Sequence, residues 1–131
     1  MNLLLDTQTL LWWKEGSRKL GRRARRAIET DATTVRVSAA SAWEIAIKAR
    51  AGRLELKQPL DAWLPDGLTR EGFLMLSVTV EHAVAVASLP DYHQDPFDRL
   101  LIAQGRAEGL TIVTSDAAFD DYDVRVLDAR A

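Results

Sequence analysis

Near its start the chain reads Asn2-Leu3-Leu4-Leu5-Asp6, a short apolar run that ends at a carboxylate. An apolar run of this length is typical of a buried strand, and residues 7–13 after it favour a helical turn. A carboxylate directly after three leucines is costly to bury without a partner. The segment therefore predicts a buried strand with a functional acid, Asp6, at its carboxyl end.

Strand and helix patterns alternate along the rest of the chain. The further predicted strands are residues 34–38, 73–78, 111–114 and 124–127. The further predicted helices are residues 17–30 capped by Ser17, a helix from Ser41 closed by Gly52, residues 80–88 capped by Thr79, and Asp95 through Glu108 closed by Gly109. Residues 53–72 show only a short helix around 60–64. This alternation predicts an α/β fold, a three-layer α/β/α sandwich with a central parallel sheet.

Composition narrows the class of protein. The 131 residues, 47% of them hydrophobic, fit a single domain over 1–131 with one continuous core. There is no cysteine, so a metal must be bound by oxygen or imidazole, and a cytoplasmic location is expected. The start of the chain lacks a signal peptide pattern, and no segment reaches the roughly 18 uninterrupted apolar residues of a membrane span.

Four carboxylates are expected at one edge of the predicted sheet. Asp6 and Asp116 come directly after strands, and Glu44 lies in the first turn of the helix that follows the second strand. The helix that contains Asp98 runs antiparallel to the strand after it, which returns Asp98 to the same edge. Ligands of parallel α/β sheets bind at this edge. Like charges so close require a cation, and an all-oxygen site suits Mg²⁺ or Mn²⁺ and metal-assisted phosphoryl transfer.

Each acid also has a purely structural interpretation. Glu44 is the last residue of a Ser-x-x-Glu capping box that begins at Ser41, and this role has the same weight as the functional one. Asp95 precedes Pro96 and fits a helix N-cap, which is the better interpretation for this residue. Asp98 can act as a favourable first-turn charge, and Asp116 can begin a turn.

Other polar residues carry weaker signals. His82 and His93 are few and far apart, so surface or capping roles are expected for them rather than an imidazole metal site. The net charge of −2 does not exclude a polyanionic substrate, because six of the 17 basic residues fall between Arg18 and Arg26. A basic helix face is usually solvated, and contact with RNA phosphates is the functional alternative. The residues concerned are Arg22, Arg23, Arg25 and Arg26.

Several segments together resemble a known family. They occur in family order as Leu3-Leu-Leu-Asp6-Thr7, Ser41-Ala-Trp-Glu44-Ile45, Asp95-Pro-Phe-Asp98-Arg99-Leu-Leu-Ile-Ala103-Gln104, and Thr114-Ser-Asp116 with Phe119 and Tyr122. The chain resembles PIN-domain proteins, and more narrowly the VapC-type toxins of bacterial toxin–antitoxin pairs. The resemblance spans residues 3–126, with residues 53–72 uninformative.

The resemblance implies a parallel α/β/α fold, Mg²⁺- or Mn²⁺-dependent endoribonuclease activity on RNA, homodimerisation, and a cognate antitoxin that blocks the site. It implies that Asp6 and Asp98 are the principal metal ligands and catalytic residues, with Glu44 and Asp116 completing the acidic pocket. It also suggests that Thr114 or Ser115 orients water or phosphate.

Three rival classes compete with this interpretation. A receiver-like phospho-acceptor domain needs two adjacent acids after the first strand and a late lysine, whereas Thr7 follows Asp6 and no lysine follows Lys57. A haloacid-dehalogenase-type phosphatase needs an aspartate at the position of Gln8. A catalytically silent PIN-fold interaction module is the remaining alternative, and the intact acids at all four positions argue against it.

Overall fold

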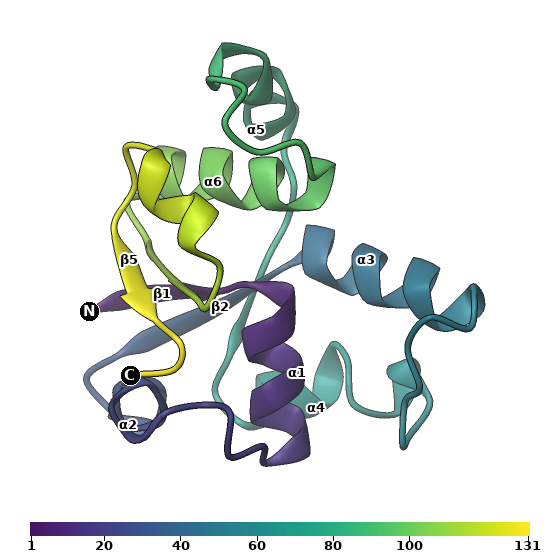
Figure 1. Cartoon of the computed structure of the whole chain (residues 1–131). Helices are drawn as coiled ribbons and strands as arrows, with labels where there is room; N and C mark the ends of the chain where they lie inside the picture. Colours follow the sequence, from purple (N-terminus) through teal and green to yellow (C-terminus); the bar gives the residue numbers. More distant parts are fainter.

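Five parallel strands form the centre of the molecule, in the spatial order β3-β2-β1-β4-β5 (Figure 1). A computed structural model of the chain describes residues 1–131. The strands are β1 (Asn2–Leu5), β2 (Thr34–Ser38), β3 (Leu74–Leu76), β4 (Thr111–Thr114) and β5 (Val126–Asp128). From β1 the chain builds one half of the sheet through β2 and β3, and later adds β4 and β5 on the other side. The order therefore reverses between β1 and β4.

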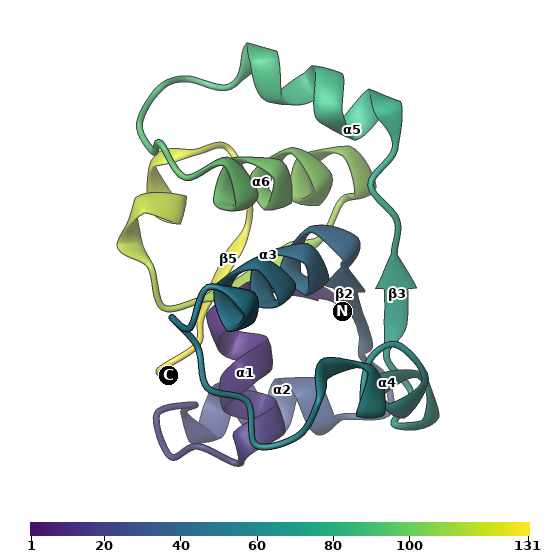
Figure 2. The same cartoon turned by 90° about the vertical axis from the view of Figure 1, so that its right-hand side faces the viewer.

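Helices cover both faces of the sheet. They are α1 (Thr7–Glu15), α2 (Arg22–Glu29), α3 (Ala39–Arg50), α4 (Asp66–Arg70), α5 (Val80–Ala85) and α6 (Pro96–Glu108), with short 3₁₀ turns η1 (Leu60–Ala62), η2 (Val86–Ser88) and η3 (Ala117–Asp121). Figures 1 and 2 show α1, α2 and α4 below the sheet and α5 and α6 above it. Helix α3 lies at the carboxyl end of the strands and packs against both α1 and α6. The three-layer α/β/α prediction is confirmed.

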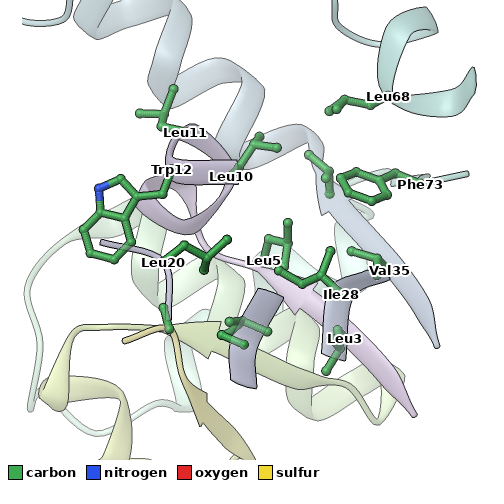
Figure 3. Close-up of a cluster of buried hydrophobic side chains, with 14 of the residues drawn as sticks. Leu3, Leu5, Leu10, Leu11, Trp12, Leu20, Ile28, Val35, Leu68 and Phe73 are labelled. Atoms are coloured by element: carbon green, nitrogen blue, oxygen red, sulfur yellow. The ribbon is translucent and has the colours of Figure 1, made fainter. Parts of the chain in front are cut away.

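The leucine run of β1 explains why both faces are covered. Successive side chains of a strand point to opposite faces. Leu3 and Leu5 belong to the apolar cluster under α1 and α2, where they lie near Ile28 (Figure 3). Leu4 belongs to the cluster on the opposite face, with Leu101 of α6. All three leucines are fully buried, so this strand is stable only between two layers.

The basic helix begins later than predicted. It starts at Arg22 after Gly21, and the Ser17 hydroxyl accepts a bond only from the Lys19 amide. The carbonyl oxygen of Ala131 accepts the amide protons of Arg23 and Ala24, so a distant segment supplies the cap. A Cβ atom at Gly21 would lie 2.1 Å from that oxygen, which explains the glycine.

The third helix begins earlier than predicted. Ser38, rather than Ser41, is the N-cap of α3, and its hydroxyl accepts the amide proton of Ala40. As predicted, Thr79 caps α5, Asp95 caps α6, and α6 ends at Gly109 with φ 66°. The helix predicted over residues 80–88 is α-helical only to Ala85 and continues as η2, and α4 was not predicted. None of the helices combines the length and the apolar character needed to cross a membrane.

Candidate active site

A hollow of about 320 Å³ opens where the strand order reverses, between the carboxyl ends of β1 and β4. This switch point is the usual ligand site of an open parallel sheet. The hollow is lined by Asp6, Thr7, Gln8, Leu11, Glu44, Lys48, Arg53, Leu54, Asp95, Asp98, Ser115 and Asp116. The structure thus brings together all four carboxylates that the sequence singled out.

Asp6 lines the hollow and is buried, with 5% of its surface exposed. It is the N-cap of α1: Oδ1 accepts the Thr9 amide at 2.8 Å, and Oδ2 accepts the Thr114 hydroxyl at 2.6 Å. Burial raises the pKa of Asp6 above its ordinary value of 3.8, the charge of Glu44 adds to the rise, and the hydrogen bonds from Thr114 and Thr9 oppose it. The carboxylate is therefore oriented, yet its charge is not compensated.

Asp98 lies in the first turn of α6, one turn inside the cap. The Asp95 carboxylate accepts the Asp98 amide at 2.9 Å, which confirms the predicted N-cap and leaves the Asp98 side chain free to enter the hollow. Burial raises the pKa of Asp98 from 3.8 to about 6. Bonding to His93 opposes this rise, and the charges of Asp95 and Asp6 add to it.

Glu44 does not close a capping box, because α3 begins five residues before it. Its side chain is buried in the hollow, where Oε1 accepts the Thr7 hydroxyl at 2.6 Å and Oε2 pairs with Lys48 Nζ at 2.5 Å. The structural interpretation of Glu44 as a capping residue was wrong. Unlike Asp6 and Asp98, this carboxylate is paired with a lysine.

Asp116 follows β4 at the rim and is more exposed than the other acids. Its Oδ1 accepts the amide of Ala118 at 2.9 Å and so caps η3, which matches the expected turn. Its Oδ2 lies 3.4 Å from Nε2 of His93. One oxygen thus stabilises the turn, while the other faces the site.

His93 belongs to this site, against the expectation of a surface or capping role. Its Nε2 lies 2.7 Å from Asp98 Oδ2. The loop before α6 folds back over the first turn of the helix and places the imidazole between Asp98 and Asp116. The only available signal in the sequence was the position of His93, two residues before the segment Asp95–Gln104 that contains Asp98. His82, in contrast, is a capping residue, since its ring accepts the Thr79 amide.

Some of the remaining predicted site residues lie at the hollow and others do not. Thr114 is buried and its hydroxyl donates to Asp6, whereas Ser115 lines the hollow. None of the four arginines of α2 lines the hollow. Two cations that the sequence reasoning missed, Lys48 and Arg53, do line it. Lys48 had a signal in its position four residues after Glu44, on the same helix face.

The donor set fits a hard divalent cation. No lysine or arginine pairs with Asp6, Asp98 or Asp116, so these carboxylates meet in a partly buried space without a permanently charged partner. Carboxylate oxygens are the preferred protein ligands of Mg²⁺ and Mn²⁺. Such an arrangement can hold a cation and a phosphate group, with Lys48 and Arg53 available for phosphate oxygens.

The fold and the site define a parallel α/β protein with an acidic pocket at the switch point of its sheet. Residues 3–125 match the family described as PIN domain, and the chain belongs to the PIN-domain family. This confirms the resemblance drawn from the sequence. The chain is also 32% identical over 115 residues to Ribonuclease VapC22 of Mycobacterium tuberculosis, covering 87% of this chain and 86% of that protein.

Solved structures have the same fold. The crystal structure of VapBC2 from Rickettsia felis bound to a DNA fragment from their promoter superposes with a TM-score of 0.72 and 14% identity, covering 97% of this chain and 98% of that one. A toxin–antitoxin complex from Klebsiella pneumoniae gives a TM-score of 0.67 and 16% identity, covering 97% of each chain. At these identities the likeness concerns the fold alone.

Proposed function

We propose that the chain, with residues 1–131 as one nuclease domain, is an endoribonuclease that uses Mg²⁺ or Mn²⁺ to hydrolyse phosphodiester bonds in RNA. The observation that carries this proposal is the burial of Asp6 and Asp98 in one hollow, with raised pKa values and no lysine or arginine partner. A divalent cation offsets the repulsion between such carboxylates. The identity to a protein named as a ribonuclease supports RNA as the substrate.

Asp6 and Asp98 would hold the ion, with Asp116 and Glu44 completing the acidic pocket. When bound, a divalent cation supplies Lewis-acid stabilisation of charge on the phosphate and lowers the pKa of an attacking water. Thr114 fixes one oxygen of Asp6 and the Thr9 amide fixes the other, so that the carboxylate keeps one orientation. This preorganisation limits the rearrangement needed when substrate arrives.

Other lining residues are suited to the phosphate group. Lys48 and Arg53 present positive charge at the hollow, where RNA phosphates would otherwise meet only carboxylates. Ser115 lines the same hollow, and its hydroxyl can orient water or a phosphate oxygen. Thr114 acts through Asp6, which makes it a positioning residue rather than a catalytic one.

We further propose that the protein is the toxin of a toxin–antitoxin pair, with a cognate antitoxin and a homodimeric assembly as its partners. The similarity to VapC22 and the fold shared with a toxin–antitoxin complex support this role. The alternative is a PIN fold that has kept only an interaction function. The retention of all four carboxylates in one hollow favours the enzyme.

The test is incubation of the purified protein with structured and unstructured RNAs, in the presence of Mn²⁺, Mg²⁺ or a chelator. Cleavage that requires either ion is expected, and a variant Asp98→Asn is the matched control for a contaminating nuclease. Absence of cleavage for every RNA, from folded protein that still binds Mn²⁺, would favour the interaction module.

A further inference from the structure

One imidazole, that of His93, lies beside two of the carboxylates that line the acidic hollow. His93 Nε2 lies 2.7 Å from Asp98 Oδ2 and 3.4 Å from Asp116 Oδ2. Each of the three residues offers one ligand atom, and these atoms all lie within 4.8 Å of one another. The side chains of His93 and Asp98 are each 20% exposed and that of Asp116 is 44% exposed, so an ion can reach the group from solvent.

The spacing of these atoms suits one octahedral ion. With ligands at about 2.1 Å, neighbouring ligand atoms are about 3.0 Å apart and opposite ones about 4.2 Å apart. The two distances from His93 Nε2, 2.7 and 3.4 Å, lie on either side of the neighbouring value. The 2.7 Å contact is a hydrogen bond, so an ion would replace the proton that His93 and Asp98 share and release it to solvent. Side-chain adjustments would then bring all three atoms to ligand positions around one ion.

Contacts outside the acidic cluster hold His93 in this position. Its backbone amide donates to the Tyr122 hydroxyl at 2.9 Å, and its carbonyl oxygen accepts a bond from Arg99. Its ring forms a T-shaped contact with Phe119, with the ring centres 6.2 Å apart. The imidazole is thus held beside Asp98 and Asp116 by groups that would not themselves touch an ion. Such support is expected of a ligand whose geometry must be maintained.

We propose that His93 is a metal ligand, binding a divalent cation through Nε2 together with Asp98 and Asp116. Imidazole is a good ligand for transition-metal ions, whereas Mg²⁺ prefers an all-oxygen shell. The site therefore selects Mn²⁺ over Mg²⁺. This role rests on the function proposed above, because Asp98 is also one of the residues proposed there to hold the ion.

The test is pulsed electron paramagnetic resonance of the wild-type protein with bound Mn²⁺, which detects coupling to a directly bound imidazole nitrogen. The chain has only two histidines, and the other, His82, is bonded to Glu108 and stays in place in every variant. We expect nitrogen coupling in the wild type and its loss in His93→Ala and His93→Gln. The glutamine variant retains a hydrogen-bonding side chain, and circular dichroism checks that both variants are folded.

Calorimetric titration of the same three proteins with each ion gives a second readout. In His93→Ala the affinity for Mn²⁺ should fall about 10- to 100-fold, while the affinity for Mg²⁺ changes less. Bound Mn²⁺ without nitrogen coupling in the wild type, or tighter Mn²⁺ binding by His93→Ala, would overturn the ligand role and leave the proposed nuclease intact. Failure of the wild type to bind either ion would instead overturn the proposed function itself.

Discussion

Thr114 and Asp6 are 108 positions apart, yet Thr114 Oγ1 donates a hydrogen bond of 2.6 Å to Asp6 Oδ2. The bond joins the ends of two neighbouring strands, β4 and β1, and both side chains are almost completely buried. The same hydroxyl oxygen accepts the backbone amide of Asp116 at 3.0 Å. One threonine therefore holds an acid in the pocket and shapes the turn that carries another.

Replacement of Thr114 by valine tests this positioning role. The variant Thr114→Val keeps the shape of the side chain and removes the donor, so the affinity for Mn²⁺ should fall about 10-fold or more. The metal-free protein should lose about 1–3 kcal/mol of stability at neutral pH, because a buried carboxylate loses a partner. Thr114→Ser restores the hydroxyl and should recover most of both properties. Calorimetry and urea unfolding measure them, and equal losses in the serine variant would contradict the role.

The raised pKa of Asp98 predicts how the stability of the metal-free protein depends on pH. Its folded pKa of about 6 lies above the ordinary 3.8, so the folded state binds the proton more tightly than the unfolded state does. The free energy of unfolding should therefore fall as pH rises from about 4 to about 6, by at most about 3 kcal/mol from this group. Urea unfolding in a chelator across this pH range measures the change.

The variant Asp98→Asn is the control for this assignment. Asparagine cannot ionise, so without metal the variant should be more stable than the wild type at pH above about 6 and similar near pH 4. Addition of Mn²⁺ should stabilise the wild type more than the variant. RNA cleavage should be abolished. A variant less stable than the wild type at neutral pH without metal would show that the charge of Asp98 is already compensated.

Asp95 and Asp98 should respond differently to the same substitution. Asp95→Asn should retain much of the activity, since asparagine caps helices about as well as aspartate. Asp95→Ala should lower the free energy of unfolding by about 0.5–2 kcal/mol, because the amide of Asp98 loses its acceptor. Cleavage rates and thermal unfolding are measured for both Asp95 variants and compared with those of Asp98→Asn. Loss of all activity in a folded Asp95→Asn variant would place Asp95 in the catalytic site.

The products of cleavage should carry 5′-phosphate ends. In the proposed mechanism the nucleophile is a water made more acidic by the cation, and the ribose 2′-hydroxyl takes no part. A substrate with a single 2′-deoxy residue at the cleavage position should therefore still be cut. End-group analysis of the fragments identifies which ends are formed. Products with 2′,3′-cyclic phosphates would rule out attack by water.

The exposed arginines of α2 should contribute to RNA affinity without sequence preference. Reversing the charges of Arg22, Arg23 and Arg26 should weaken binding similarly for all RNAs and reduce the salt slope by about 0.7 for each RNA phosphate that the protein no longer neutralises. Arg25 is left intact because its guanidinium donates to the Ser17 carbonyl and lies over the Trp13 ring. Fluorescence anisotropy at several salt concentrations measures the slope, with Arg106→Glu on α6 as the surface control. An unchanged salt slope would show that this helix face does not contact RNA phosphates, and that it is solvated or binds another partner.

The local sequence was sufficient to predict those elements that depend on neighbouring residues. The leucines of β1 are buried on both faces, Asp95 and Pro96 begin α6, and Gly109 ends it, because these preferences depend on neighbouring residues alone. The convergence of the four acids was also predictable, since the carboxyl ends of parallel strands share one edge. Whether those acids bind metal and catalyse cleavage stays a prediction.

Contacts between distant segments account for the errors. The start of α2 is set by the carbonyl of Ala131, about a hundred residues further along the chain. Glu44 matched a capping box in spacing, but Ser38 takes the cap and turns Glu44 toward Thr7. A capping motif has several acceptable registers, and the packing of the helix selects one of them.

The sequence by itself determined the alternating strands and helices and the sheet edge at which the acids lie. Hydrophobic periodicity and the order of the elements can both be read directly from the sequence. Only the tertiary structure decided the environment of each acid. Glu44 is paired with Lys48, Asp6 is bonded to Thr114, and Asp98 meets His93. Burial and charge compensation depend on atoms brought together from separate elements, so carboxylates with similar sequence signals lie in different environments.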